Sequence, residues 1–340
     1  MAGADTGGAE TFFVDLVGAL ARAGLDQRAV IRRNERRAAA LASVGIAVHE
    51  LRFGRMFDFA TRRGIATAAR EFQPAIVQSW MTRATRHMPR GSFVRVGWLG
   101  GYYDPNGFAD CDHVVGVTAD IVRHLVDGGF APSRAHHLPT FAAVGDAAPV
   151  PRASLATPAD AQIILALGRL HEKKGFDVLL KALGQVPGAW LWLAGEGPLR
   201  ADLEAIARQI GVAERVRFLG WRSDRDALLA ACDVCVMPSR HEPFGTVMIE
   251  AWAARRPLIV AAAAGPKALV RPEIDAVLVP VDDAAALAVA LQRVLGDRGL
   301  ARRLAAEGRA AYEERFTEAV VVQQYLEFYR RIATGSVVAA

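Results

Sequence analysis

The chain has 340 residues, of which 52% are hydrophobic and 23% charged, a balance that allows two buried cores and argues against extensive disorder. The formal net charge is +5, the 3 cysteines do not make a disulfide framework, and no apolar run is long enough to span a membrane. Residues 1–10 contain neither a basic segment nor an apolar core, so we expect no signal peptide and a location in the reducing cytoplasm.

The first half of the chain alternates helix and strand signals. A helix is predicted from Gly7-Gly8-Ala9-Glu10 to about Ala23, and another begins at its capping residue Thr118. Alternation of this kind indicates a parallel sheet with crossover helices. Residues 1–145 are therefore predicted to form a Rossmann-like domain, with a further helix over 57–72 and strands near 29–31, 46–48, 75–77, 93–96 and 113–117.

The segment ahead of Gly7 is unusual for such a domain. In a Rossmann-like sheet the glycine loop follows a central strand, but only Met1-Ala2-Gly3-Ala4-Asp5-Thr6 precedes it here, with no β-branched run. The N-terminal sheet is therefore expected to lack its first strand, or to have that position filled by another segment. The hypothesis that follows is a truncated chain, or a start codon placed too far downstream.

The second half repeats the alternating pattern. Residues 146–160, rich in proline and small residues, are predicted to be a linker, and residues 161–316 a second Rossmann-like domain. A last helix over 317–332 is expected to pack back on the N-terminal domain. The strands of the second domain are predicted at 163–167, 190–194, 216–219, 234–237, 258–260 and 277–279.

Two glutamates flank a predicted turn from strand to helix. Residues 234–237 are typical of a buried strand and 245–255 of a helix, which puts Glu242 in a loop at the carboxyl edge of a sheet. Open α/β sheets bind ligands at that edge, and the first free amides of a helix attract anions. Because helical side chains lean toward the helix N-terminus, Glu250 is expected to point to the same edge.

A nucleotide-diphosphate sugar would satisfy this arrangement. Each carboxylate accepts hydrogen bonds from vicinal sugar hydroxyls, and the phosphates would lie at the helix start. Two cations, Arg169 and Lys174, follow the first strand of the same domain and suit a diphosphate. From spacing alone, a solvated surface pair of glutamates and solvated cations remain open alternatives.

The run Pro238-Ser239-Arg240-His241-Glu242-Pro243-Phe244-Gly245, followed by Glu250-Ala251, resembles the signature of the family-4 retaining glycosyltransferases. The Arg169 and Lys174 segment and the Gly7-Gly8 loop are also similar to that family. The resemblance covers residues 163–316 well and the first half loosely. It implies a GT-B fold, with two Rossmann-like domains facing across a cleft, the acceptor on the first and the donor on the second.

The same resemblance implies roles for individual residues. Arg169 and Lys174 would neutralise the diphosphate, and Glu242 would hold hydroxyls of the donor sugar. Glu250 would hold the ribose, with Gly7 and Gly8 near the donor phosphates and acceptor and the backbone of Phe244, Gly245 and Thr246 against phosphate and sugar. No metal and no cofactor besides the nucleotide sugar is expected.

Two departures from the family leave open which acceptor the chain uses and whether it is catalytic. Relatives often place a donor-binding histidine where this chain has Trp98–Asp104, and an Asn-Gly where it has Leu138–Phe141. The alternatives are a GT-B epimerase or phosphorylase, or a catalytically silent sugar-nucleotide-binding subunit. The stretches Gln78–Ala84 and Gly100–Asp104 most resemble bacterial enzymes that build lipopolysaccharide core or related envelope glycans.

The first third of the chain is rich in arginine. A basic face attracts nucleic acid, anionic lipid or phosphorylated glycan, but it is also often an ordinary solvated face. Because no stacking aromatics or nucleic-acid module accompany these arginines, nucleic acid is not an expected partner. A glycan or lipid-linked acceptor and peripheral contact with the cytoplasmic membrane are expected instead. The clusters are Arg32-Arg33, Arg36-Arg37, Arg62-Arg63 and Arg83 with Arg86.

Overall fold

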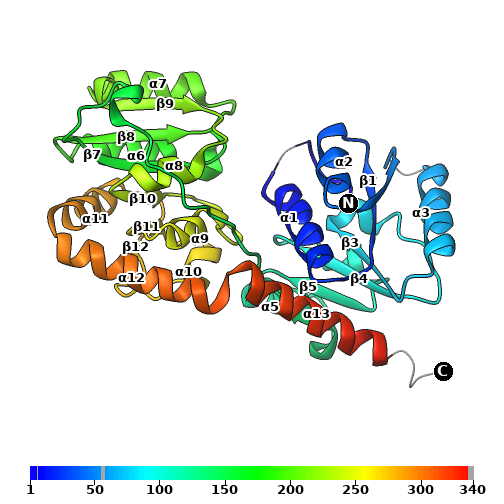
Figure 1. The fold of residues 1–340 in the computed structure, drawn as a ribbon. Helices are drawn as coiled ribbons and strands as arrows, with labels where there is room; N and C mark the ends of the chain where they lie inside the picture. The colour runs from blue at the N-terminus through cyan, green and yellow to red at the C-terminus, as the bar shows by residue number, and fades with distance from the viewer. Residues whose placement is uncertain (6, 55–57, 336–340) are drawn as a thin grey trace. The chain divides into compact units, whose positions relative to one another are not determined.

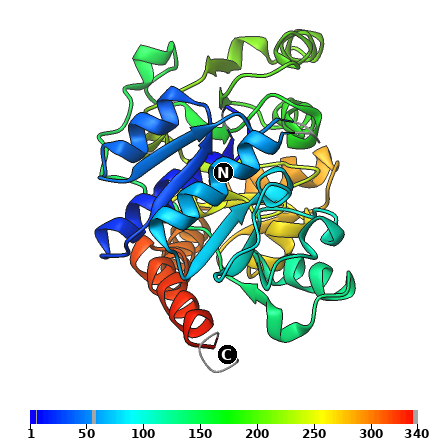
Figure 2. The same cartoon turned by 90° about the vertical axis from the view of Figure 1, so that its right-hand side faces the viewer.

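A computed structural model describes residues 1–5, 7–54 and 58–335, which form two compact units (Figures 1 and 2). Unit 1 comprises Met1–Phe141 together with the chain from Glu318 onward, and unit 2 comprises Ala142–Thr317. Each unit is an α/β structure built on parallel strands, as the alternating sequence pattern predicts.

The predicted elements of unit 1 are present, together with two short α-helices and a short strand that the sequence pattern did not indicate. Thr118 caps α5 as predicted, because its side chain accepts a hydrogen bond from the Ile121 amide. The unpredicted elements are α2 (Glu35–Ala42), α4 (Met81–Thr85) and β6 (Ala135–His137). The others are α1 (Gly8–Arg22), β1 (Arg28–Arg32), β2 (Ala47–Leu51), α3 (Phe59–Phe72), β3 (Ile76–Trp80), β4 (Val94–Leu99), β5 (His113–Gly116), α5 (Ala119–Asp127) and α13 (Glu318–Gly335).

The strands of unit 1 are divided between two sheets. The strands β1 and β2 pair with each other, while β3, β4, β5 and β6 form a second sheet in that order. Within the described residues no strand joins β1 to β3, so the expectation of a domain without its first strand is confirmed. Met1 lies beside β1, where its amino group donates to the Val30 carbonyl and its carbonyl accepts from the Arg32 amide.

The last helix, α13 (red in Figure 1), packs on unit 1, where the ring centroids of Phe328 and of His113 on β5 lie 6.3 Å apart. The Trp98 indole Nε1 donates to the Tyr325 hydroxyl at 3.0 Å, and both side chains are buried. The Tyr329 hydroxyl donates to Gln78 Oε1 at 2.9 Å. These bonds satisfy polar groups that burial would otherwise leave unpaired.

Unit 2 has a single six-stranded parallel sheet of order β12-β11-β10-β7-β8-β9, the doubly wound Rossmann order. All six strands predicted from apolar runs are present. They are β7 (Gln162–Leu167), β8 (Ala189–Ala194), β9 (Val216–Gly220), β10 (Val234–Met237), β11 (Leu258–Ala261) and β12 (Val277–Val279). The helices are α6 (Phe176–Leu183), α7 (Arg200–Gln209), α8 (Arg225–Ala231), α9 (Thr246–Ala253), α10 (Ala264–Leu269), α11 (Ala284–Gly296) and α12 (Arg298–Arg315).

Residues 142–160 have little regular structure but pack on unit 2. The Val150 amide donates to the Ala227 carbonyl at 3.1 Å, and the Trp192 indole donates to the Thr157 hydroxyl at 3.0 Å. Cys232 and Cys235 are free thiols buried in the same unit, as expected for core cysteines.

Gly308 lets α12 approach α9, the helix that carries Glu250. A Cβ at Gly308 would lie 2.2 Å from Trp252 Cδ1, and Trp252 is fully buried.

We expect Gly308→Ala to destabilise the protein by about 1–3 kcal/mol through overpacking, measured by urea unfolding. At Gly296, on α11, the added methyl meets nothing within 4 Å, so Gly296→Ala should change stability by less than about 0.5 kcal/mol. Equal effects of the two substitutions would show that the α9–α12 contact is not tight.

Candidate functional site

The loops that follow β7 and β10 lie at the point where the strand order of unit 2 reverses. These two strands are neighbours in the sheet, Val234 pairing with Ile164 and Cys235 with Leu165. In open α/β sheets ligands bind outside the carboxyl ends of the strands at such a reversal. Residues 168–175 follow β7 and residues 238–245 follow β10, and they carry most of the site residues predicted from the sequence.

The backbones of these two loops contact each other directly. The amides of Arg240 and His241 donate to the Lys173 carbonyl at 2.9 and 3.1 Å. Gly175 has φ +65°, and a Cβ there would lie 2.2 Å from the Pro238 carbonyl oxygen, so this position requires glycine. The loop conformation is therefore set by the local backbone.

The Arg240 side chain fastens the same loops together. Its guanidinium donates to both carboxylate oxygens of Asp177 at 2.7 Å and to the Glu172 carbonyl at 2.8 Å, and it also binds Asp282. The bidentate bond to Arg240 lowers the pKa of the Asp177 carboxyl below its usual value. Arg240 stands two residues before Glu242, but no role is predicted for it from the sequence.

Lys174 and Glu242 form an ion pair across the two loops. The Lys174 Nζ donates to Glu242 Oε2 at 2.5 Å, with the lysine side chain 27% and the glutamate 13% exposed. The Glu242 carbonyl accepts from the Gly265 amide at 2.8 Å, which supports the loop from the β11 side. The structure thus brings together a cation and a carboxylate that the sequence placed 68 positions apart.

Glu250 is buried in α9 and is paired with a cation from another element. Its Oε1 lies 2.9 Å from Nη1 of Arg225, the first residue of α8. Because α8 follows β9, Arg225 lies on the carboxyl side of the sheet, and Glu250 points to that side as predicted. The sequence gave no signal for Arg225, since it lies outside the recognised motif.

The remaining predicted residues of unit 2 surround these pairs. Arg169 is exposed after Gly168, and the described residues offer its side chain no hydrogen bond or ion pair. The Phe244 ring is buried against Phe316, with ring centroids 6.0 Å apart, so its side chain belongs to the core. Gly245, at φ +102°, is the N-cap of α9, and Thr246 is the first residue of that helix. Their backbone amides stand at the helix N-terminus.

Gly7 and Gly8 lie in unit 1, at the start of α1. Gly7 is the N-cap of this helix, and a Cβ there would lie 2.3 Å from Oε2 of the buried Glu10. The other carboxylate oxygen of Glu10 accepts from the Ala4 amide at 2.7 Å. The glycine loop therefore folds tightly around Glu10.

The stretch that stands in place of the family's histidine follows β4. The Tyr102 hydroxyl donates to the Asp120 carboxylate, and burial followed by this bond raises the pKa of Tyr102 to about 12. His124, on α5, lies against the same loop, with its Nε2 2.8 Å from the Tyr103 carbonyl. A histidine is thus present beside the loop, but it comes from a different element.

Two features are absent from the described part of the chain. It contains no group of three His, Cys, Asp or Glu side chains arranged to hold a metal ion. None of its helices is both long and apolar enough to cross a membrane.

Residues 150–311 match the family described as glycosyl transferases group 1. Two lipopolysaccharide core biosynthesis glycosyltransferases of Rhizobium meliloti (strain 1021) are similar over nearly the whole chain. LpsD is 36% identical over 329 residues, which cover 96% of this chain and 95% of the relative. LpsE is 35% identical over 328 residues, covering 94% and 95%.

Solved structures share the fold at lower sequence identity. Anabaena HepE, in complex with UDP-glucose, superposes with a TM-score of 0.84 at 20% identity, covering 97% of this chain and 98% of the other. WaaG, a glycosyltransferase involved in lipopolysaccharide biosynthesis, gives a TM-score of 0.73 at 16% identity, covering 96% and 97%. Both similarities extend over the two units, so the chain has the GT-B fold of these proteins.

The contact of Arg240 with Asp177 predicts a pH-dependent contribution to stability. Because the folded pKa of Asp177 is lowered, the ion pair stabilises the fold above the unfolded pKa of about 3.9 and is lost as the pH falls through the folded value. The difference in free energy of unfolding between wild type and Arg240→Met should therefore be constant near neutral pH and shrink below about pH 4. The exposed Arg208 supplies the control Arg208→Met. If urea unfolding showed the same difference between wild type and Arg240→Met down to pH 3, the stabilising role of the Arg240–Asp177 pair would be contradicted.

Proposed function

Since the chain belongs to the group 1 glycosyl transferases, we propose that it transfers a sugar, with retention of configuration, from a nucleotide-diphosphate sugar to lipopolysaccharide core or a related envelope glycan. The Rhizobium relatives, named for lipopolysaccharide core biosynthesis, support this acceptor class. HepE, solved with UDP-glucose, supports the donor class.

The observation that carries the proposal is the Lys174–Glu242 pair at the strand-order reversal of unit 2. A diphosphate needs cations and a sugar needs hydrogen-bond acceptors, and this pair offers one of each within a single contact. In our proposal the diphosphate binds Lys174 and the exposed Arg169, while the hydroxyls of the donor sugar donate hydrogen bonds to Glu242. The phosphate also accepts hydrogen bonds from the backbone amides of Phe244, Gly245 and Thr246 at the start of α9.

The ribose is assigned to Glu250. Its carboxylate is buried, so two hydroxyls that bind it would do so in a partly desolvated site, where hydrogen bonds to a charged group are strong. Arg225 pairs with this carboxylate and orients it. Gly7 and Gly8 are proposed to approach the donor phosphates and the acceptor.

Catalysis then consists of positioning and charge stabilisation. As the bond between the anomeric carbon and the phosphate oxygen breaks, negative charge grows on the diphosphate, where Arg169 and Lys174 stabilise it. The acceptor hydroxyl attacks from the same face of the sugar, and its proton passes to the leaving phosphate oxygen. Because two side-chain cations perform this task, the proposal includes no metal and no cofactor.

The test is turnover of radiolabelled UDP-glucose and GDP-mannose with and without a core-oligosaccharide acceptor. Transfer that requires the acceptor is expected. Isomerised donor in the absence of acceptor would favour an epimerase, and binding without turnover would favour a silent binding subunit.

Lys174→Ala should lower kcat by about 100- to 1000-fold while weakening donor binding much less, because the lysine acts mainly on charge that develops in the transition state. Lys173→Ala is the matched control, since Lys173 is the adjacent, exposed lysine and contributes its carbonyl to the loop contact. It should leave kcat nearly unchanged. A raised KM with unchanged kcat in Lys174→Ala would refute the role of Lys174.

The acceptor side is proposed to lie against the cytoplasmic membrane surface through the arginines of the first third. Helix α3 exposes Arg62 and Arg63 together with Phe59, which is 71% exposed. An exposed aromatic side chain beside arginines suits an anionic lipid interface. This contact would bring the enzyme to a lipid-linked acceptor.

Binding to phosphatidylglycerol vesicles should decrease as salt rises, because the Debye length falls to about 8 Å at physiological ionic strength. Arg62→Gln combined with Arg63→Gln should weaken binding by about 1 kcal/mol per charge. Arg302→Gln combined with Arg303→Gln makes the same charge change at exposed positions of unit 2 and should have little effect. Binding that does not depend on salt, or equal effects of the two pairs, would leave the α3 arginines as a solvated face.

A further inference from the structure

Two histidines of unit 1 lie together against the last helix. His113 is the first residue of β5 and His136 lies on β6, and Nδ1 of His113 is 3.0 Å from Nε2 of His136. Both rings pack on Phe328 of α13, with centroids 6.3 and 4.7 Å from that of the phenyl ring. Phe328 is 2% exposed. The histidine pair is therefore part of the surface on which α13 docks.

The hydrogen bonds of the pair determine where its protons are. Nη2 of Arg331, on α13, lies 3.4 Å from Nδ1 of His136. A guanidinium can only donate, so this Nδ1 accepts and the proton of the imidazole is on Nε2. That Nε2 then donates to Nδ1 of His113. The chain of donors from Arg331 through His136 to His113 thus requires both imidazoles to be neutral.

The charges around the pair oppose a further proton. The charged groups that face it are Arg331 on α13, Arg134 ahead of β6 and Asp112 ahead of β5. The carboxylate of Asp112 is already shared, because it accepts from the Arg95 amide at 2.7 Å and lies 3.8 Å from the Arg95 guanidinium. The face of the Phe328 ring would attract an imidazolium, but the Arg331 guanidinium lies 6.0 Å from the same ring centroid.

Docking of α13 therefore depends on pH. Burial, followed by the charges of His113 and Arg331, lowers the pKa of His136 to about 4. Burial lowers the pKa of His113 too, opposed by the charge of Asp112 and reinforced by the two arginines. An imidazole released from these contacts returns to a pKa of about 6.5. Since the released form binds more protons, docking is strongest above about pH 6.5 and weakens as the pH falls toward about 4.

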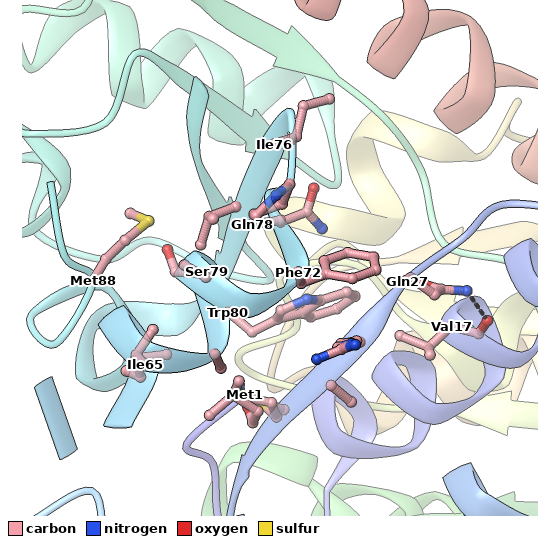
Figure 3. A pocket seen from close by; sticks show the side chains of 18 of the residues that line it. Met1, Val17, Gln27, Ile65, Phe72, Ile76, Gln78, Ser79, Trp80 and Met88 are labelled. Carbon is pink, nitrogen blue, oxygen red and sulfur yellow. Dashed lines mark hydrogen bonds between the residues drawn. The ribbon is translucent and has the colours of Figure 1, made fainter. Parts of the chain in front are cut away.

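We propose that His113 and His136 form a proton-sensitive latch that holds the C-terminal half of α13 on β5 and β6 at neutral pH and loosens it in mild acid. The same half of the helix carries Tyr329, whose hydroxyl donates to Gln78 on β3 at 2.9 Å. Both residues line the pocket of about 450 Å³ drawn in Figure 3, so loosening α13 also opens one wall of this pocket. The latch does not depend on the proposed sugar transfer, in which none of these residues has a role.

The test is hydrogen exchange of the amides of residues 326–333 at pH 7.5 and pH 5.5, corrected for the intrinsic exchange rates. With a pKa of about 4 when docked and about 6.5 when released, protonation of His136 alone should make opening about tenfold more frequent at pH 5.5. The double variant His113→Gln with His136→Gln should open equally at both pH values, because glutamine stays neutral and still offers a donor and an acceptor.

His49→Gln is the matched control, since His49 is a half-buried histidine on β2, and it should keep the tenfold rise. Equal opening of the wild type at both pH values, or a tenfold rise in the double variant, would overturn the proposal. So would loss of the rise in His49→Gln.

Two further measurements decide the matter if the double variant does not fold. Arg331→Met removes a cation that opposes protonation, so the rise between pH 7.5 and pH 5.5 should shrink, and a full tenfold rise would contradict the latch. In the wild type, nuclear magnetic resonance should find the His136 ring still neutral at pH 5.5. A ring that titrates near pH 6.5 in the folded protein would also overturn the proposal.

Discussion

The candidate site depends on the contact between the loops that follow β7 and β10. Two backbone amides of the second loop bind the Lys173 carbonyl, and Gly175 lets its own loop approach the Pro238 carbonyl. The Arg240 guanidinium then ties the second loop to Asp177 at the start of α6. Because backbone bonds, a glycine and a bidentate ion pair all fix this one contact, Lys174 and Glu242 are held in place before any ligand arrives.

Both carboxylates of the candidate site are paired with cations in the absence of a ligand. Glu242 is paired with Lys174 and Glu250 with Arg225, so neither partly buried carboxylate is left without a cation. In the proposed reaction the donor separates the Lys174–Glu242 pair. Its diphosphate binds Lys174 in place of Glu242, and its sugar hydroxyls bind Glu242 in place of Lys174. In this proposal the same residues stabilise the empty site and bind a ligand that carries both kinds of group.

The sequence predicted the parts of the structure that local patterns determine. The six strands of unit 2 are short apolar runs bounded by Gly, Pro or charge, and the split sheet of unit 1 follows from the lack of a β-branched run before Gly7. Arg240 and Arg225 were missed because their roles depend on contacts with distant residues, which no local pattern reveals. The hydrogen bonds of Met1 with β1 were missed for the same reason. The short elements α2 and β6 were missed because few residues carry their periodic signal.

Hydrogen exchange with and without a nucleotide sugar tests most directly whether the edge of unit 2 is the donor site. With UDP-glucose or GDP-mannose at saturation, the amides of residues 168–176 and 240–250 should exchange more slowly, and those of α11 should not change. Protection restricted to other segments, or no protection by any nucleotide sugar, would contradict the assignment.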